Sequence, residues 1–452
     1  MQKSLRVLAL CSFLVSAHYA RAVPSFARQT GLSCNVCHTN PPELTAFGRN
    51  FKLRGYVLTD MTAKDKVGNA KDLLLSKYIP VAVMMLMSNT AYQSTPPSAS
   101  TSASGQPTTV PAQNNSAGFP QQLSIFFAGG FASHFGGLAQ ITYTHADDKF
   151  GMDNTDLRYA NQTKIHGKDL WYGITVNNNP TVEDVWNSTS AWGFPWIQTA
   201  SAVTPLASPV INGALAEDVA GVGGYGMWNN HLYGDITLYR SEHAGVSPPI
   251  TGAGSAYNIS GVAPYWRAAW QQTWGANYLE VGTYGIDVNS FPNAVTGPED
   301  RYTDPSIDFQ YERPFGPNLL DAHGTWIHEN SNLGATFAAG GAAFANHHLN
   351  TLKLDSTFHW RSRYSATGAL FSTTGTRDPV LYAPAPVTGS NNGDPDSDGY
   401  IAQVAFWPVQ NIDIDFNYTG YWKFNGAATN YDGAMRNASD NNTAYLALWL
   451  NF

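Results

Sequence analysis

Three side chains that could hold a metal cofactor lie within five consecutive positions near the start of the chain: Cys34, Cys37 and His38. They form the pattern C-x-x-C-H, which is the attachment pattern of a c-type haem. Two thiols three positions apart on one helical turn can each bond a vinyl group of the same porphyrin, and the next histidine then lies under the iron. The spacing therefore predicts one covalent haem c, bound through Cys34 and Cys37, with His38 as proximal iron ligand.

Two other kinds of site compete for the same pattern. A redox-active C-x-x-C pair belongs to a thioredoxin-like βαβ unit, and no such unit is indicated around residues 34–37. A zinc site needs two further cysteines or histidines nearby, but His38 is the only histidine between residues 23 and 133. Haem attachment is the interpretation that the residues favour.

The first 22 residues have the three parts of a secretory signal peptide. Lys3 and Arg6 form the positive region, residues 7–16 form the apolar region, and residues 20–22 read Ala-Arg-Ala, a cleavage site. We therefore expect the exported chain to begin at Val23.

Removal of this peptide would change both the cysteine content and the charge. Cys11 would be lost, which leaves Cys34 and Cys37 as the only cysteines. Three positive charges and no negative charge would also be lost, so the formal net charge would change from −8 to −11. An exported chain this acidic is a poor partner for nucleic acid.

Residues 23–77 form the expected cytochrome c-like domain. About 55 residues make a thin core, so we expect this segment to depend on the rest of the protein to bury its haem. Methionines are the candidates for the second iron ligand. Met61 lies just beyond the haem motif, and Met84 is the methionine of the first apolar run that shares a face with Ser88 and Thr90. Met84 is therefore the candidate distal ligand, although simple filling of apolar space is the more common role for each of these methionines.

From residue 78 onward the dominant signal is a period of two. Apolar and polar side chains alternate in residues 304–313, 351–361 and 411–424, which is typical of β-strands with two different faces. About sixteen such runs can be marked. No stretch approaches the ~18–20 apolar residues that a membrane helix needs, so a membrane crossing would have to use strands.

The links between these runs alternate between short and long. Short links are residues 134–136, 166–169, 229–230, 313–317, 362–363 and 408–410, and long links are residues 93–120, 179–217, 243–262, 288–303, 329–347 and 374–398. Short periplasmic turns and long exterior loops are the pattern of an outer-membrane barrel, and the alternating final run that ends on Phe452 suits a closing strand. The predicted fold class is all-β: an antiparallel outer-membrane β-barrel of about sixteen strands, residues 78–452, behind a small α-helical haem domain.

The longest of these loops is rich in aromatic residues, which would be costly to expose. It is therefore expected to fold into the lumen as a constriction, with a partner surface outside as the alternative. Glu183 and Asp184 near its start could meet a cation there.

Several motifs together resemble the fused cytochrome–porin iron oxidases of iron-oxidising bacteria. They are residues 23–31 (VPSFARQTG), the C-x-x-C-H motif, residues 42–49 (PELTAFGR), residues 51–56 (FKLRGY), residues 177–186 and residues 424–443. The resemblance covers both ends of the mature chain and several strands between them.

This resemblance implies a single haem in or under a porin, with extracellular Fe(II) as electron donor and a soluble periplasmic cytochrome or similar carrier as acceptor. The chain would then be an oxidoreductase of the bacterial outer membrane, surrounded by its lipid, with the haem domain on the periplasmic side or inside the lumen. Fe(II) would approach past Glu183 and Asp184. Because Fe(III) precipitates near neutral pH, taking the electron at the outer surface would leave the iron outside. Two alternatives stay open: a diffusion porin with a haem-bearing plug or sensor, and electron export to an external acceptor.

Overall fold

The computed structural model describes residues 23–58, 78–101, 107–110, 114–144, 148–242, 257–292 and 295–452. The expected signal peptide and Met61 lie outside the described residues. Helical segments in the described part are α2 (Pro24–Thr30), the 3-10 helix η1 (Cys34–Val36), α3 (Ala46–Leu53), α4 (Pro180–Glu183), α5 (Gly334–Ala338) and the 3-10 helix η3 (Ala438–Asn441). Of the helices in these ranges, none combines the length and the apolar character needed to cross a membrane.

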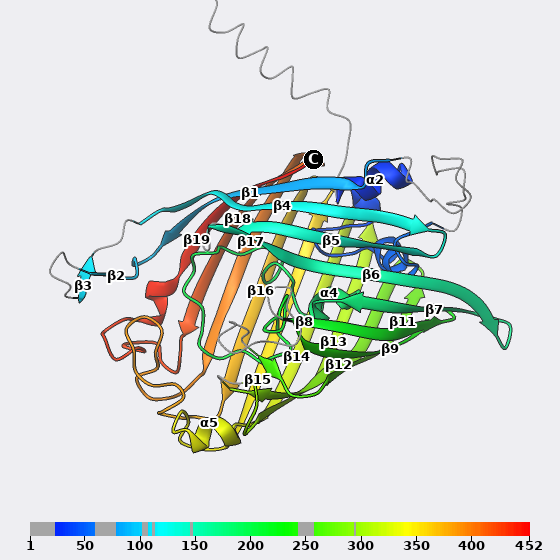
Figure 1. Cartoon of the computed structure of the whole chain (residues 1–452). Coiled ribbons are helices and arrows are strands. Elements are labelled where there is room, and N and C mark those ends of the chain that lie inside the picture. The colour runs from blue at the N-terminus through cyan, green and yellow to red at the C-terminus, as the bar shows by residue number, and fades with distance from the viewer. Residues whose placement is uncertain are drawn as a thin grey trace, which may run out of the picture.

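Sixteen antiparallel strands form one closed barrel (Figure 1). They are β1 (Val81–Tyr92), β4 (Ser116–Ala132), β5 (Phe135–Thr144), β6 (Lys149–Ile165), β7 (Lys168–Asn177), β8 (Val219–Trp228), β9 (Leu232–Ser241), β11 (Ala263–Trp274), β12 (Asn277–Phe291), β13 (Asp300–Phe315), β14 (Asn318–Asn332), β15 (Asn346–Trp360), β16 (Tyr364–Gly375), β17 (Ser397–Val409), β18 (Ile412–Lys423) and β19 (Thr443–Asn451). The short β10 (Asn258–Ile259) adds to β12, and β2 (Ser98–Thr101) pairs with β3 (Pro107–Val110) in a separate hairpin.

The barrel closes between its first and last strands. β1 pairs with β4 on one side and with β19 on the other, with Met84 opposite Asn451 and Tyr92 opposite Thr443. The expectation that the last alternating run closes a barrel of about sixteen strands is confirmed.

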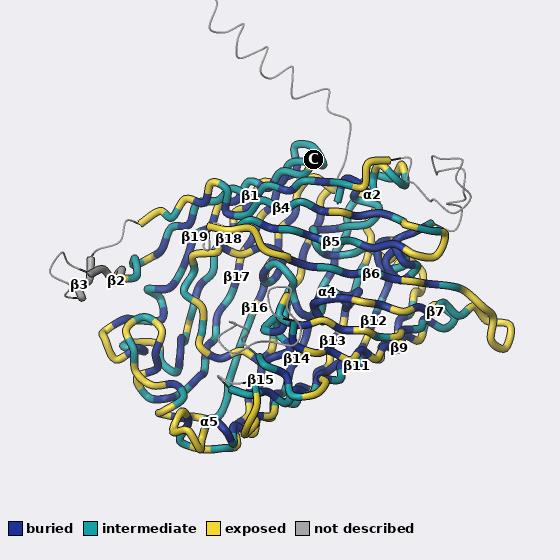
Figure 2. Tube along the Cα trace, viewed as in Figure 1, coloured by how far each residue is buried: buried dark blue, intermediate teal, exposed yellow. Residues whose placement is uncertain are grey.

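Most strands have an outer apolar face and an inner face that carries polar side chains, whereas the inner faces of β1 and β19 are largely apolar. In β9 every second residue is exposed, and the exposed set includes Leu232, Ile236 and Leu238, whereas Asp235 and Thr237 are buried inside. β18 follows the same rule, with Ile414 and Phe416 outside. Figure 2 shows this alternation along the strands as a change between exposed and buried colours. Lipid is the environment that an apolar outer surface of this extent suits, because in water it would favour aggregation.

The two ends of the barrel differ in their connections. At one end the links are short: residues 133–134, 166–167, 229–231, 275–276, 316–317, 361–363 and 410–411. Most links at the other end are long, as the alternation of link lengths predicts (Figure 1). Some strands are longer than the sequence indicated, so that the loop expected at residues 288–303 spans only residues 292–299. These strand ends were missed because Asn289 and Ser290 interrupt the apolar alternation, while their backbones still pair with β13.

Residues 23–58 lie in the barrel at the end with the short turns. The backbone N–H of Cys34 donates to Gln410 Oε1 in the turn between β17 and β18, at 3.2 Å. Tyr225 of β8 donates from its hydroxyl to the carbonyl of Leu53, at 2.8 Å. Arg49 forms an ion pair with Glu312 of β13, at 2.7 Å. The segment thus gains its burial from the barrel strands, as its short length predicts.

The loop between β7 and β8, which we call the constriction loop, also fills the lumen. Its Val185 and Trp186 are buried in one apolar cluster with Leu53 of the N-terminal segment and Tyr233 of β9. Farther along the loop, Trp196 donates to Thr357 of β15, at 3.3 Å. The expectation of a constriction inside the barrel is confirmed, and this aromatic run is not an exterior surface.

A buried arginine ties this loop to the wall. Arg267 of β11 lies against Asp184 of the loop at 3.3 Å, Glu280 of β12 at 3.1 Å and Asp308 of β13 at 2.6 Å. Its guanidinium also stacks over the ring of Trp186, 4.7 Å from the centroid. The positive charge of Arg267 therefore offsets part of the free-energy cost of burying three carboxylates.

Replacing Arg267 by methionine should be strongly destabilising, because three buried carboxylates would lose their counter-charge. We expect a loss of about 3–5 kcal/mol, measured by urea unfolding of the folded protein in detergent, followed by tryptophan fluorescence. The control is Arg301→Met, because Arg301 pairs with Asp287 on the exposed surface and should cost at most about 1 kcal/mol. Equal effects of the two substitutions would contradict this account.

Candidate functional site

The C-x-x-C-H residues form one tight turn. Cys34–Val36 make the 3-10 helix η1, and the backbone N–H groups of Cys37 and His38 both donate to the carbonyl of Cys34, at 2.9 Å each. The turn is anchored by Thr45, whose hydroxyl donates to the carbonyl of Val36 at 2.5 Å. Both thiols and the histidine are therefore carried by a single turn of chain, as the haem interpretation requires.

The imidazole of His38 is oriented by a backbone carbonyl. Its Nδ1 lies 3.0 Å from the carbonyl oxygen of Glu43. A carbonyl oxygen can only accept, so Nδ1 carries the proton and Nε2 carries the lone pair. Metal-binding histidines ordinarily make such a contact through the ring nitrogen that does not bind the metal, because it fixes the tautomer and the ring orientation.

An apolar cavity lies beside this turn, and we call it the His38 cavity. Cys37 and His38 line one side, α3 contributes Phe51, and the barrel wall contributes Phe126 and Leu138. Its empty volume is about 840 Å³ including the open mouth. The residues present thus fit a porphyrin: thiols on one turn, an oriented imidazole, and apolar walls.

Helix α3 can approach the turn only because of a glycine. Thr45 caps the helix by accepting from the backbone N–H of Gly48, at 3.1 Å. A Cβ at Gly48 would lie 2.2 Å from the carbonyl oxygen of Cys37, a distance that atoms cannot adopt. The close contact of α3 with the C-x-x-C-H turn therefore requires glycine at this position.

Redox exchange by the two cysteines is disfavoured by their surroundings. Cys34 is buried, and burial raises the pKa of the Cys37 thiol to about 11. A free thiol there would stay protonated near neutral pH, whereas thiol–disulfide exchange needs a thiolate. This observation favours haem attachment over a C-x-x-C redox pair.

Met84 does not line the His38 cavity. Its side chain faces the lumen, as the alternation in β1 predicts, and is buried with Phe126, Trp449 and Val23. Phe126 and Val23 reach the cavity, but Met84 lies behind them. Its role as distal iron ligand stays a prediction, and the structure places the methionine in an apolar cluster.

Glu183 and Asp184 are occupied by structural contacts. Glu183 is fully buried and accepts hydrogen bonds from Thr237, at 2.5 Å, and from the hydroxyl of Tyr239. Asp184 pairs with Arg267 and accepts from the backbone N–H of Trp186, at 3.0 Å. Their proposed role in the approach of Fe(II) stays a prediction, but both carboxylates already hold the constriction loop in place.

The sequence analysis missed a cluster of ionisable residues next to the C-x-x-C-H turn. Glu43, Asp321 and His323 each bring a potential ligand atom within 4.8 Å of the others. Asp355 and His359 of β15 extend the cluster. Burial opposes ionisation of Glu43, but its interactions with His323, His359 and Thr39 together outweigh this effect and lower the pKa of Glu43. The only signal in the sequence was the inward position of Asp355 and His359 in an alternating strand.

Neither the models of known protein families nor the curated proteins match this chain. Among solved structures it is similar to Salmonella typhi OmpF in complex with daunomycin, with 10% identity, a TM-score of 0.47, and coverage of 83% of this chain and 98% of that chain. It is also similar to DcaP, an outer membrane channel of Acinetobacter baumannii, with 10% identity, a TM-score of 0.47, and coverage of 82% and 96%. OmpT, an outer membrane protein of Vibrio cholerae, gives 9% identity, a TM-score of 0.42, and coverage of 83% and 97%. Similarities this weak say nothing about the chemistry of the site.

The substitution Gly48→Ala should disturb the haem surroundings without preventing attachment. The added methyl group would push α3 away from the Cys37 carbonyl and loosen the contact between His38 and Glu43. We expect an unchanged haem stain on denaturing gels and a shifted Soret band in the folded protein. Ala46→Ser, at an exposed position of the same helix, is the control. A Gly48→Ala spectrum identical to that of the natural protein would contradict the packing argument.

Proposed function

We propose that this protein is an outer-membrane oxidoreductase that takes electrons from extracellular Fe(II) and passes them, through one covalent haem, to a soluble periplasmic carrier. One observation carries the proposal: the C-x-x-C-H turn sits inside the lumen of a closed barrel, with His38 beside an apolar cavity. The resemblance to cytochrome–porin iron oxidases supplies Fe(II) as the donor.

The barrel supports this proposal as an insulating wall around an electron path. Its strands expose apolar side chains such as Ile174, Ile236 and Val404 to the outside, which suits outer-membrane lipid. The turn that carries Cys34 is bonded to Gln410 at the end with the short turns, which is the periplasmic end in barrels of this kind. A periplasmic carrier would therefore meet the haem segment from that side.

The chain's own residues would hold and orient the cofactor. Cys34 and Cys37 would bond it, and the carbonyl of Glu43 would keep Nε2 of His38 available to the iron. Phe51, Phe126 and Leu138 would exclude water from its face. When bound, the haem would supply one-electron chemistry, so that each Fe(II) oxidised to Fe(III) releases one electron for the carrier.

An outer cavity gives the substrate a way toward this site. It lies between the constriction loop and the inner wall formed by β15–β19, with an empty volume of about 1,540 Å³ including its open part. Thr351, Asn417 and Thr443 are among its lining residues, so its surface includes polar groups that hydrated cations can contact.

The same cavity favours the alternative of a diffusion porin with a haem-bearing plug. In that case solutes would cross the lumen past the N-terminal segment. Electron export to an external acceptor would use the same parts in reverse, and the haem potential relative to the Fe(III)/Fe(II) couple would decide its direction.

Mixing the oxidised protein with Fe(II) under anaerobic conditions tests the proposal. We expect rapid appearance of the reduced haem spectrum, with about one haem reduced for each Fe(II) oxidised. Mn(II), which cannot reduce a haem under these conditions, is the control for effects of a divalent charge alone. A haem spectrum that Fe(II) leaves unchanged would defeat the proposed donor.

Planar-bilayer conductance separates the plugged electron carrier from the diffusion porin. For an electron carrier we expect low conductance, because the N-terminal segment and the constriction loop both occupy the lumen. Steady conductance of small solutes that is insensitive to the haem redox state would favour the porin instead.

A further inference from the structure

The cluster beside the haem turn joins three parts of the protein. Glu43 comes from the N-terminal segment, Asp321 and His323 come from β14, and Asp355 and His359 come from β15. The register of the two strands sets His323 directly opposite Asp355. All five therefore converge at the barrel end that holds the C-x-x-C-H turn.

Three of these residues offer ligand atoms around one point. His323 Nε2 lies 3.0 Å from Glu43 Oε1, and Asp321 completes a group whose ligand atoms are all within 4.8 Å of one another. Atoms bound to one ion at ~2.1 Å lie within about 4.2 Å of each other. A shift of a few tenths of an ångström would thus let all three bind one cation.

The remaining two residues support these ligands from behind. Asp355 Oδ2 lies 3.0 Å from His323 Nδ1, and His359 Nε2 lies 2.6 Å from Asp321 Oδ2. Metal-binding histidines usually donate their other ring N–H to a carboxylate, and metal-binding carboxylates are themselves hydrogen-bonded. The cluster has both of these outer contacts.

An unpartnered buried atom points to a missing ligand. Asp321 is fully buried, and its Oδ1 has no hydrogen-bond partner among the described residues. The side-chain oxygen of Gln310, which lies beside Glu43, is also buried without a partner. Leaving a buried carboxylate oxygen unsatisfied is costly, and a bound cation would remove that cost.

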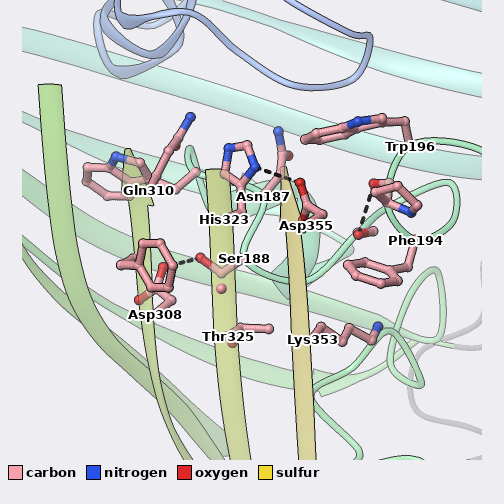
Figure 3. A pocket seen from close by; sticks show the side chains of 15 residues that line it. Asn187, Ser188, Phe194, Trp196, Asp308, Gln310, His323, Thr325, Lys353 and Asp355 are labelled. Atoms are coloured by element: carbon pink, nitrogen blue, oxygen red, sulfur yellow. Dashed lines mark hydrogen bonds and ion pairs between the residues drawn. The ribbon is translucent and has the colours of Figure 1, made fainter. Parts of the chain in front are cut away.

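The cluster can be reached from a small cavity. Figure 3 shows His323 and Asp355 facing each other at the wall of this cavity, which we call the His323 cavity, with Asn187 beside them. Its volume of about 20 Å³ is room for one water-sized body. Lys353 lines both this cavity and the outer cavity, and Asn187 lines both this cavity and the His38 cavity. The His323 cavity thus lies between the outer cavity and the haem turn.

From these contacts we infer that Glu43, Asp321 and His323 form a binding site for a divalent transition-metal ion, with Asp355 and His359 as positioning residues. Two carboxylates with one imidazole suit Fe(II) and Mn(II), since oxygen ligands favour hard ions and imidazole favours iron. A divalent charge would also offset the three carboxylates buried here.

Glu43 would connect this site with the haem ligand. Its side chain contributes Oε1 to the metal site, while its backbone carbonyl accepts the Nδ1–H of His38. The role of the site as the place where Fe(II) gives up its electron rests on the proposed function. Cation binding by the site does not.

Mn(II) titration of the full-length haem protein in detergent tests the site, because bound Mn(II) loses the six-line electron paramagnetic resonance signal of the free ion. We expect one tight site, which Zn(II) displaces because it binds such ligands more strongly than Mn(II). Asp321→Asn and His323→Gln should each weaken binding at least about tenfold. The control is His347→Gln, since His347 also pairs with a buried carboxylate, Asp378 at 2.9 Å, but at the loop end of β15.

A measurement on the natural protein guards against variants that fail to fold. Pulsed electron paramagnetic resonance of bound Mn(II) should detect the nitrogen of one coordinated imidazole. Absence of that nitrogen, or equal weakening by His347→Gln, would overturn the metal site.

The two proposals can fail separately. If Fe(II) reduces the haem of the Asp321→Asn and His323→Gln variants as fast as that of the natural protein, the site is not the point of oxidation, while the proposed function stands. If Mn(II) binds as expected but Fe(II) never reduces the haem of the natural protein, the site stands and the proposed function fails.

Discussion

The pairing of β1 with β19 is the constraint on which the rest of the structure depends. Because the first and last strands meet, every strand of the described barrel has two neighbours, and the barrel wall has no open edge of unpaired backbone amides. β1 also contacts the N-terminal segment, since Arg28 donates to the carbonyl of Val81 at its start. The strand that closes the wall is thus one of several that hold the segment carrying the C-x-x-C-H turn.

Buried arginines hold the N-terminal segment and the constriction loop against this wall. Arg49 joins the N-terminal segment to Glu312 and stacks over a tyrosine ring. Arg158 of β6 pairs with Asp156, at 2.9 Å, and donates to the carbonyl of Glu183 in the constriction loop, at 2.7 Å. Arg267 of β11 holds the same loop from another part of the wall. Because an isolated buried charge is costly, these pairs discourage sliding of the segment or the loop within the barrel.

The strands of the barrel wall could be predicted from the sequence better than the contacts of the segments inside the lumen. Strands such as β9 and β18 follow from strict alternation, and the alternation of link lengths identified the two ends. That Cys34, Cys37 and His38 share one turn followed from their spacing, because a helical turn is a local property. The meeting of Glu43 with His323 depends on strand register and on how the segment enters the lumen, and no local spacing encodes either. The contacts of Glu183 could not be predicted for the same reason: its place in a long loop does not show that the hydroxyls of Thr237 and Tyr239 donate to it inside the lumen.

The burial of Cys34 restricts the stage at which a cofactor could be attached to it. Its side chain is only 1% exposed, so an enzyme that modifies its sulfur could not reach it in the folded protein. A thioether at this position would therefore have to form before the segment folds into the barrel. Cofactor loading would then come before insertion of the strands, and a chain that misses this step could not be repaired after assembly.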